Sequence, residues 1–214
     1  MMEKKIKINV FGGDDSEVTK LIVRFLENGG DYNILSKKIQ LPAGRGLGGT
    51  TGERGGRSVT IEVGHCSVPG CRDLLARTGD GFIISFSLSS PISLQEAKDS
   101  LTLIQRGRPG EDFPIMLIGN LSSEKTTSTD SRMSQQQQQQ QQRDAIQFAS
   151  LIGATYFEFD SSSDQEVDEC FNYLAEEILR SDSAGNGNGN IAAEKVKRKP
   201  STRLAKKIKS FFQK

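Results

Sequence analysis

The chain has 214 residues, of which 35% are hydrophobic and 26% are charged, and this composition predicts one soluble globular domain with additional polar, low-complexity segments. No run of about 18 apolar residues occurs, which argues against a transmembrane helix. The first residues have neither the apolar core of a signal peptide nor a glycine for myristoylation. Cys66, Cys71 and Cys170 lack metal-ligand spacing and indicate reduced thiols in the cytosol.

The charge is unevenly distributed along the chain. Residues 195–214 contain nine Lys or Arg and no Asp or Glu, a net charge of +9. Because the whole chain carries +1, the first 194 residues carry 1 − 9 = −8. An acidic body with a basic tail indicates that the tail is a separate interaction segment.

Residues 5–26 predict a strand, a glycine turn and a helix. Ile6, Ile8 and Val10 alternate with polar residues, and Gly12-Gly13 ends the strand. Apolar residues then recur at helical spacing, at Val18, Leu21, Ile22, Phe25 and Leu26. This order is the setting of a phosphate-binding loop, in which backbone N–H groups and a helix N-terminus hold anionic oxygens.

The loop residues depart from the phosphate-binding pattern G-x-x-x-x-G-K-[ST]. From Gly12 the chain reads GGDDSEVT, so Glu17 stands at the second glycine and Val18 at the lysine. Thr19 keeps the hydroxyl, which makes it the remaining candidate Mg²⁺ ligand. The loop therefore argues against a bound nucleotide.

Three carboxylates of this loop stand where phosphates would have to lie. Asp14, Asp15 and Glu17 flank Ser16. At an effective dielectric of about 20, two like charges about 4 Å apart repel by roughly 4 kcal/mol. We interpret the acidic residues as a solvated helix start, favoured by the helix dipole; direct metal binding by Asp14 or Asp15 is the alternative.

The remaining chain alternates strand and helix patterns. Strands are expected at residues 32–41, 58–63, 81–88, 113–119 and 155–159. Helices are expected after a loop within 65–75, through 145–152 and through 167–178. Another helix is expected to begin at Ser90-Pro91, with a buried stripe of Ile92, Leu94, Ala97, Leu101 and Ile104. The pattern predicts an α/β three-layer domain: about six strands in a mostly parallel sheet, with five helices on both faces.

Three polar segments interrupt or follow this domain, which is expected to span residues 1–180. Residues 43–57 are rich in glycine and predict a mobile loop. Residues 122–142 are rich in Ser and Thr, end in the eight glutamines Gln135–Gln142, and predict a disordered surface insertion. Residues 181–194 predict a flexible linker to the tail at 195–214.

The segment RTGDGFIISFS, at residues 77–87, resembles the Ras-like small GTPases. The likeness continues through PISLQEAKDSLTLIQR, FPIMLIGN and TYFEFDSSSDQEVDECFNYLAEEI. It covers residues 5–180 in element order. The resemblance implies a P-loop NTPase-type (Ras-like) fold, GTP or GDP with Mg²⁺ as the family's ligand, and protein effectors or regulators in signal transduction as partners.

The switch motifs of the family are altered here. No Mg²⁺-binding threonine stands near residues 36–40. The D-x-x-G motif falls on residues 61–64, so Gly64 remains while Ile61 replaces the metal-orienting aspartate. His65 stands where the water-positioning glutamine would be, and the alternative is an ordinary loop residue. Glu62 could replace the aspartate only after a one-residue slip, which would reverse its face of the strand.

The base-reading motifs are altered as well. N-K-x-D falls on residues 120–123, so Asn120 remains while Ser123 replaces the carboxylate that reads guanine. S-A-K falls on residues 160–162, centred on Ser161. A metal or redox pair at Cys66 and Cys71 is less favoured, because nothing nearby in the sequence supplies further ligands or an activating partner.

The basic tail has the pattern of a short amphipathic helix after Ser201. Its apolar residues are Leu204, Ile208, Phe211 and Phe212, and its basic residues include Lys197, Arg198, Lys199, Arg203, Lys206 and Lys207. This pattern favours an anionic membrane surface or a calmodulin-like groove. The alternatives are a solvated or nuclear-targeting charge run and, less favoured, nucleic acid. The chain ends in FFQK without a prenylated C-a-a-X box.

Three hypotheses follow from the sequence. The first is a monomeric Ras-like signalling protein at the inner face of the plasma membrane or another membrane, cytoplasmic and peripheral, with GTP binding and hydrolysis weak or lost. The second is a divergent small GTPase that still binds GTP. The third is a regulator that acts through its tail while the domain serves as a carrier. No nucleic-acid partner is expected.

Overall fold

The computed structural model describes residues 4–13, 15–27, 29–31, 33–41, 57–66, 68–121, 135–159 and 164–185. The strands are β1 (Lys4–Gly12), β2 (Gly30–Asp31), β3 (Ser36–Leu41), β4 (Arg57–Gly64), β5 (Gly81–Ser87), β6 (Ile115–Asn120) and β7 (Thr155–Phe159). The helices are α1 (Asp15–Glu27), α2 (Pro69–Thr78), α3 (Ser93–Gly107), α4 (Gln135–Ile152) and α5 (Asp164–Gly185). Among these described helices, none combines the length and hydropathy that crossing a bilayer requires.

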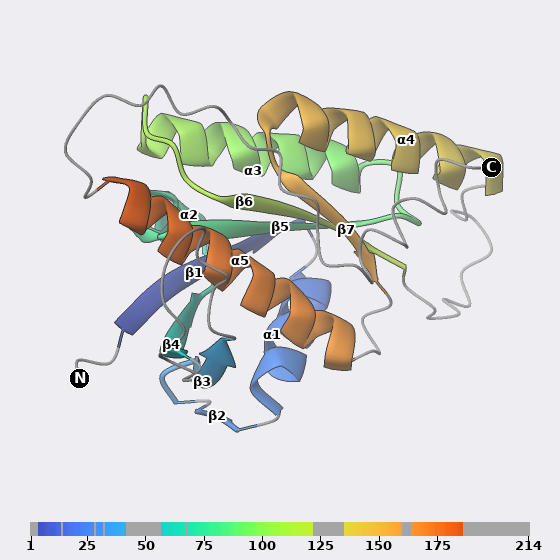
Figure 1. Cartoon of the computed structure of the whole chain (residues 1–214). Coiled ribbons are helices and arrows are strands. Elements are labelled where there is room, and N and C mark those ends of the chain that lie inside the picture. The colour runs from blue at the N-terminus through green and yellow to red at the C-terminus, as the bar shows by residue number, and fades with distance from the viewer. Residues whose placement is uncertain are drawn as a thin grey trace, which may run out of the picture. The chain divides into compact units, whose positions relative to one another are not determined.

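One seven-stranded sheet organises the described residues, with strand order β2-β3-β4-β1-β5-β6-β7. β1 is parallel to both β4 and β5, and β6 is parallel to β5 and β7, whereas β3 is antiparallel to β4. Helices α3 and α4 lie on one face of the sheet and α1 and α5 on the other (Figure 1). The predicted three-layer α/β fold is confirmed, and the additional strand is β2, which has only two residues.

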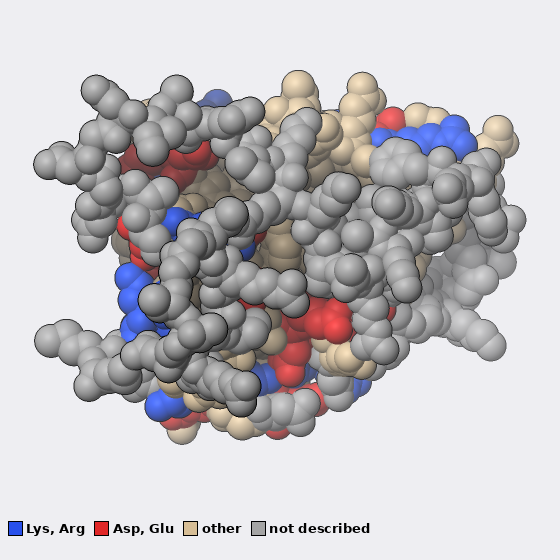
Figure 2. All heavy atoms as spheres, in the orientation of Figure 1, with Lys and Arg blue, Asp and Glu red and all other residues tan. Residues whose placement is uncertain are grey.

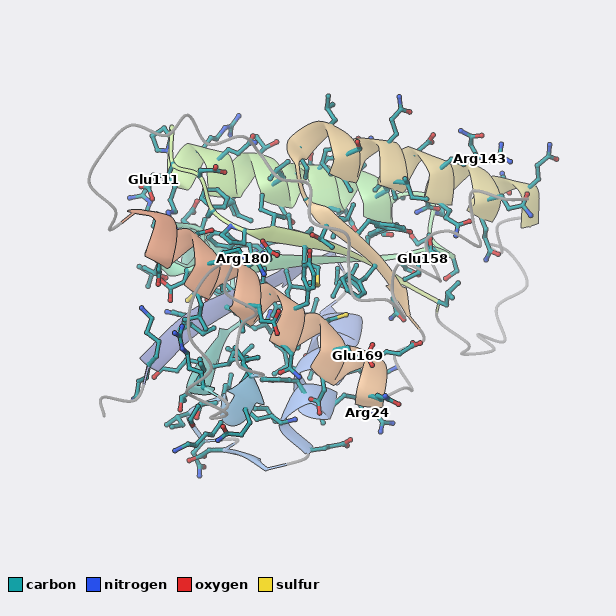
Figure 3. The ribbon with its side chains drawn as sticks, viewed as in Figure 1. Arg24, Glu111, Arg143, Glu158, Glu169 and Arg180 are labelled. Atoms are coloured by element: carbon teal, nitrogen blue, oxygen red, sulfur yellow. The ribbon has the colours of Figure 1, made fainter. Side chains whose placement is uncertain are left out.

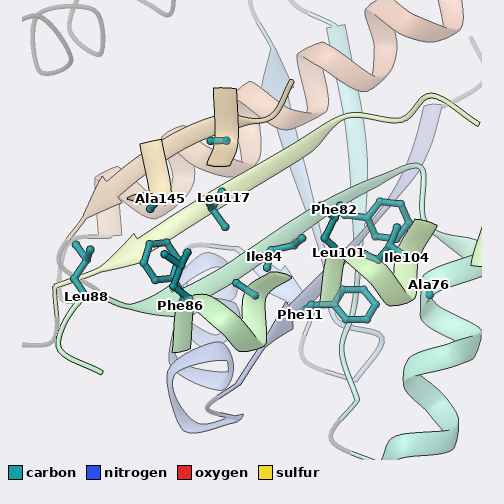
Figure 4. Close-up of a cluster of buried hydrophobic side chains, with 13 residues drawn as sticks. Phe11, Ala76, Phe82, Ile84, Phe86, Leu88, Leu101, Ile104, Leu117 and Ala145 are labelled. Atoms are coloured by element: carbon teal, nitrogen blue, oxygen red, sulfur yellow. The ribbon is translucent and has the colours of Figure 1, made fainter. Parts of the chain in front are cut away.

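The hydrophobic core has one layer on each face of the sheet. On the α2–α3–α4 face the buried cluster includes Phe11, Phe82, Ile84, Phe86, Leu101, Ile104, Leu117 and Ala145 (Figure 4). On the opposite face the rings of Phe25 in α1 and Phe171 in α5 stack, with centroids 3.8 Å apart. Burying one such large side chain contributes about 1.5–3 kcal/mol to folding, so these layers fix the helices on the sheet.

A buried lysine ties the antiparallel edge of the sheet to α1 and α5. Lys37 in β3 is only 6% exposed. Its Nζ donates to the Phe25 backbone oxygen at 2.7 Å and lies 2.6 Å from Asp168 Oδ1, and it sits 4.8 Å from the Phe25 ring centroid. A buried charge is tolerated only when it is paired and hydrogen-bonded, and these contacts satisfy that requirement.

Two strands begin later than the sequence predicted. The strand expected from residue 32 begins at Ser36, because Leu35 has φ 45° and lies in a turn. The strand expected from Phe113 begins at Ile115, after Pro114, which has no N–H to donate to a neighbouring strand.

The boundaries of one strand and two helices also differ from the prediction. Arg57, assigned to the glycine-rich segment, belongs to β4. Helix α3 begins at Ser93, so Ile92 precedes it at the N-cap and is 65% exposed, not part of the buried stripe. Helix α5 continues to Gly185, into the segment predicted as a linker. The predicted loop at 43–56, the segment 122–134 and the tail at 195–214 lie outside the described residues.

The glutamine tract is helical, which corrects the prediction of a disordered insertion through Gln142. All eight glutamines belong to α4. Gln141 is buried, and its Nε2 donates to the backbone oxygens of Ser87 at 3.1 Å and Ser90 at 2.8 Å. Gln141 shares a helix face with buried Ala145 and Ala149, at i, i+4 and i+8. Gln141 therefore extends the buried face of α4 by one turn toward the start of the helix.

Gln142, the next residue of the tract, takes part in a second polar contact, which links α4 to β7. Gln142 Nε2 donates to Glu158 Oε2 at 2.6 Å, and the Tyr156 hydroxyl donates to Glu158 Oε1 at 2.5 Å. Glu158, which accepts both bonds, is labelled in Figure 3. Burial, followed by the charge of Glu158 and this hydrogen bond, raises the pKa of Tyr156 well above its usual range. Tyr156 therefore remains a protonated donor.

Replacing Gln141 by Ala removes both hydrogen bonds to the loop after β5. Because net hydrogen bonds contribute about 0.5–1.5 kcal/mol each, we expect Gln141→Ala to lower the free energy of unfolding by about 1–2 kcal/mol, measured by urea denaturation. Gln139→Ala, at an exposed position of the same tract, is the control and changes stability by a few tenths of a kcal/mol. Equal effects of the two substitutions would contradict a specific role for Gln141.

Candidate functional site

Four parallel strands end at one edge of the sheet, where ligands of open α/β folds bind. Gly12 ends β1, Gly64 ends β4, and Asn120 ends β6 beside Ser87 of β5. Asn120 is 4% exposed and Gly64 is half-buried. The structure thus brings three of the predicted nucleotide-binding positions, Gly12, Gly64 and Asn120, to one edge.

Val18, at the lysine position of the phosphate-binding pattern, points into the protein. Its side chain is 1% exposed. A Cβ added to Gly12 would collide with Val18 Cγ2 and would also lie 3.2 Å from the Ser85 backbone oxygen. Gly12 is therefore needed because Val18 packs directly against it. The neighbouring Thr19, predicted as a weak metal ligand, lies on the exposed side of α1.

A carboxylate from α3 lies against the same loop. A Cβ added to Gly13 would collide with Oε2 and Cδ of Glu96, which is in the first turn of α3. Glu96 is half-buried. Glu96 cannot be identified from the sequence, because α3 and the loop are far apart along the chain and meet only in the folded domain. Its carboxylate adds negative charge at a position where a phosphate would require positive charge.

The altered second-switch motif is held firmly in the sheet. Ile61 is 0% exposed and pairs with Ile6 of β1 and Lys37 of β3. Glu62 lies on the other face of the strand, and its Oε1 is 3.4 Å from Lys5 Nζ. This register excludes the one-residue slip that would have placed Glu62 at the position of the family's aspartate.

Gly64 is fixed by its neighbour in β1. Asn9 is 0% exposed, pairs with Gly64, and donates from Nδ2 to the Leu75 backbone oxygen at 2.6 Å. A Cβ on Gly64 would collide with Asn9 Oδ1 and lie 2.9 Å from Leu75 Cδ2. Asn9 Oδ1 is buried without a hydrogen-bond partner among the described atoms. The close approach of α2 to the sheet therefore requires glycine at position 64.

The segment after Gly64 packs onto β1 and α3. His65 Nδ1 lies 3.4 Å from the Val10 backbone oxygen. In α2, Arg72 donates to Ser100 Oγ of α3 at 3.0 Å, and its guanidinium carbon lies 5.8 Å from the Phe11 ring centroid. These contacts hold α2, which follows the second-switch motif, against α3.

Several predicted site residues are not placed by the structure. Asp14, Ser123 and Ser161 and the tail residues lie outside the described part of the chain, and so do the side chains of Asp15, Ser16 and Glu17, whose backbone begins α1. In the described part of the chain, no three His, Cys, Asp or Glu side chains gather as metal ligands.

The mostly parallel sheet, with a glycine turn joining β1 to α1 at its ligand-binding edge, defines a P-loop NTPase-type α/β domain. The sequence model of the Ras family matches residues 64–180, more than half of the chain. The chain therefore belongs to the Ras family of small GTPases, a family of signalling proteins whose partners are effectors and regulators.

Individual relatives agree with this assignment. GTP-binding protein Rit1 of Mus musculus is 27% identical over 71% of this chain and 62% of its own length. Ras-related protein R-Ras of Rattus norvegicus is 30% identical over 51% of this chain and 45% of its own. Ras-like protein family member 11A-like of Danio rerio is 25% identical over 86% of this chain and 72% of its own. The chain thus spans less than two thirds of Rit1 and R-Ras.

The packing at Gly64 predicts that this glycine is structurally required. Gly64→Ala forces a methyl group into Asn9 and Leu75, so we expect the free energy of unfolding to fall by about 1–3 kcal/mol. Gly70→Ala is the matched control: a Cβ there meets nothing within 4 Å, and helix α2 should gain about 0.5–1 kcal/mol. Chemical denaturation of both variants checks the pair, and a neutral Gly64→Ala would refute the packing argument.

Proposed function

We propose that this protein is a pseudo-GTPase of the Ras family: a signalling protein that uses the family fold as a binding platform, with GTP binding and hydrolysis weak or lost. The burial of Val18 carries the proposal, because the position that should supply a positive charge to the β- and γ-phosphates instead packs an aliphatic side chain against Gly12. The residues present at this edge do not fit a nucleotide with Mg²⁺.

Two further observations support this proposal. Glu96 holds a carboxylate against Gly13, and carboxylate and phosphate repel each other. Ile61 is buried in the sheet where the family orients the metal with an aspartate. The match to the Ras family begins at Gly64, after the altered loop. Each change removes a different part of the nucleotide site, so restoring one of them alone does not restore the site.

The second candidate is a divergent GTPase that still binds GTP. Gly12, Gly64 and Asn120 are retained at one sheet edge, and Thr19 keeps a hydroxyl in the first turns of α1. In this alternative, backbone N–H groups and a Mg²⁺ on Thr19 would hold the phosphates without a lysine. Nucleotide content separates the two candidates.

We expect the full-length chain, purified in Mg²⁺ buffer without a chelator, to release far less than one guanine nucleotide per chain when denatured. Rit1, purified in parallel, is the positive control for a GTP-binding relative. Chromatography of the released nucleotide and titration with labelled GTP make the measurement. A folded protein that releases close to one GDP or GTP per chain would overturn the pseudo-GTPase proposal in favour of the second candidate.

A Val18→Lys variant tests whether the missing lysine alone accounts for the loss of nucleotide binding. The lysine enters a 1% exposed position, so we expect the free energy of unfolding to fall by about 1–3 kcal/mol and nucleotide binding to remain absent. Thr19→Lys, at the adjacent exposed position, should change stability by no more than about 0.5 kcal/mol. Tight GTP binding by Val18→Lys would mean that the lysine alone was missing.

The basic tail supports a membrane-associated role for this platform. We infer that residues 195–214 bind anionic lipid at the cytoplasmic face of a membrane. The first 194 residues carry −8, and acidic atoms group over α5 in the space-filling view (Figure 2), so the tail supplies the attraction. Each basic residue near an anionic leaflet contributes about 1 kcal/mol.

Full-length protein should co-sediment with phosphatidylcholine vesicles that contain phosphatidylserine, and not with phosphatidylcholine alone. Raising the salt concentration should release it, because the attraction is screened. Replacing Phe211 and Phe212 by Ala should weaken binding while leaving the charge at +9. If the chain lacking residues 195–214 binds equally well, the tail is not the membrane contact, and a calmodulin-like partner becomes the next candidate.

A further inference from the structure

The turn between β5 and α3 contains Ser90-Pro91, the one place in the sequence where proline follows a serine or a threonine. Ser90 is half-exposed, Pro91 is exposed, and Ile92 is 65% exposed. Proline-directed protein kinases recognise a Ser-Pro pair, because proline has a fixed φ and no backbone N–H that would be left unpaired in the kinase. The turn therefore presents a hydroxyl acceptor and its recognition residue together at the surface.

The hydroxyl of Ser90 differs from those of the neighbouring serines. Ser87 Oγ lies 2.8 Å from Ser89 Oγ, and Ser93 Oγ donates to the Ser87 backbone oxygen at 2.7 Å. Ser90 Oγ, in contrast, makes no hydrogen bond to another residue that the structure describes. Phosphorylation of Ser90 therefore breaks no side-chain hydrogen bond of this turn, whereas phosphorylation of the other three serines would.

We propose that Ser90 is a phosphorylation site for a proline-directed protein kinase, and that Gln141 of α4 controls how fast it is phosphorylated. The phosphate comes from ATP bound to the kinase. Ser90 Oγ attacks the γ-phosphorus, the bond from that phosphorus to the β,γ-bridging oxygen breaks, and ADP leaves. The hydroxyl proton passes to the catalytic aspartate of the kinase. The phosphoserine carries about −1.5 to −2 charges at pH 7.

Gln141, within the glutamine tract, holds the backbone of this turn in place. Its buried Nε2 donates to the Ser90 backbone oxygen at 2.8 Å and to that of Ser87 at 3.1 Å. The Ser93 backbone N–H also donates to the Ser90 oxygen, at 3.3 Å. A kinase binds its acceptor segment in an extended form, so the turn must open locally and release these bonds before transfer. The glutamine helix therefore restrains the acceptor.

The phosphate would lie close to the start of α3 and to the ligand-binding edge of the sheet. Helix α3 begins at Ser93, and its N-cap residue, Ile92, makes no side-chain capping bond. Unpaired N–H groups and the helix dipole favour an anion at such an end. The Leu88 backbone N–H donates to the Asn120 backbone oxygen at 3.0 Å, which ties the turn to that edge. Phosphorylation would thus add negative charge to a surface that exposes Ile92, whatever the nucleotide content of the chain.

Full-length protein is incubated with ATP and a purified mitogen-activated protein kinase, and separately with a cyclin-dependent kinase, and is then digested with trypsin. Trypsin releases the acceptor in the peptide 78–98, which contains no internal Lys or Arg. We expect this peptide to gain one phosphate, which fragmentation places on Ser90. Ser90→Ala and Pro91→Ala should each abolish the gain, and Ser89→Ala should keep it. Phosphate on other residues only, or none with either kinase, would overturn the proposal.

The initial rate of phosphate incorporation tests the role of Gln141. Gln141→Ala should be phosphorylated about two- to tenfold faster than the parent chain, because opening the turn no longer breaks a hydrogen bond to α4. Gln139→Ala, at an exposed position of the tract, should keep the parent rate. Gly64→Ala loosens β4 and not the turn, so it should also stay close to that rate. An unchanged rate for Gln141→Ala, or an equal acceleration by Gly64→Ala, would refute control by Gln141.

Discussion

The burial of the central parallel strands on both faces is the constraint on which the rest of the structure depends. β1, β5 and β6 lie between two helical layers, and every residue of β5 is buried. On such strands a residue is determined first by what packs against it. Gly12 faces Val18, Gly64 faces Asn9, and neither could carry a side chain. Glycines that a nucleotide site would also use are therefore required here by packing alone, and their presence is not evidence for a ligand.

The same reasoning explains how the fold persists while the site residues change. Charged groups that a GTPase would need at this edge are replaced by groups that pack: Val18 enters the core and Ile61 enters the sheet. Among the described residues, Lys37 is the one buried cation. It lies away from this edge, and Asp168 and the Phe25 carbonyl compensate its charge. The cost of burying a charge is thus compensated at Lys37, whose contacts hold β3 to α1 and α5. At the loop after β1 the apolar Val18 avoids that cost, although a bound phosphate would require a positive charge there.

Periodicity in the sequence predicted the element order because each core strand and helix has an uninterrupted apolar pattern. The prediction failed at the glutamine tract, where composition and periodicity disagreed, and at Ile92. The glutamine tract has the composition of a disordered segment, yet Gln141 is in register with Ala145 and Ala149, and the helix continues through it. Ile92 was assigned to a helical stripe by spacing, but it precedes the first helical residue. Glu96 and Asn9 could not be identified as site neighbours, because their contacts to Gly13 and Gly64 arise only when distant strands and helices assemble.

The contacts of helix α2 extend the same packing constraint beyond the edge of the sheet. Helix α2 is held to α3 by Arg72 and Ser100 and to β1 through Leu75 and Asn9, so contacts within the protein fix the helix from Arg72 to Leu75. The segment just before these contacts contains Cys66 and Cys71 and the exposed Val68. Val68, at the N-cap of α2, and Leu74 are therefore large apolar side chains that these contacts leave exposed.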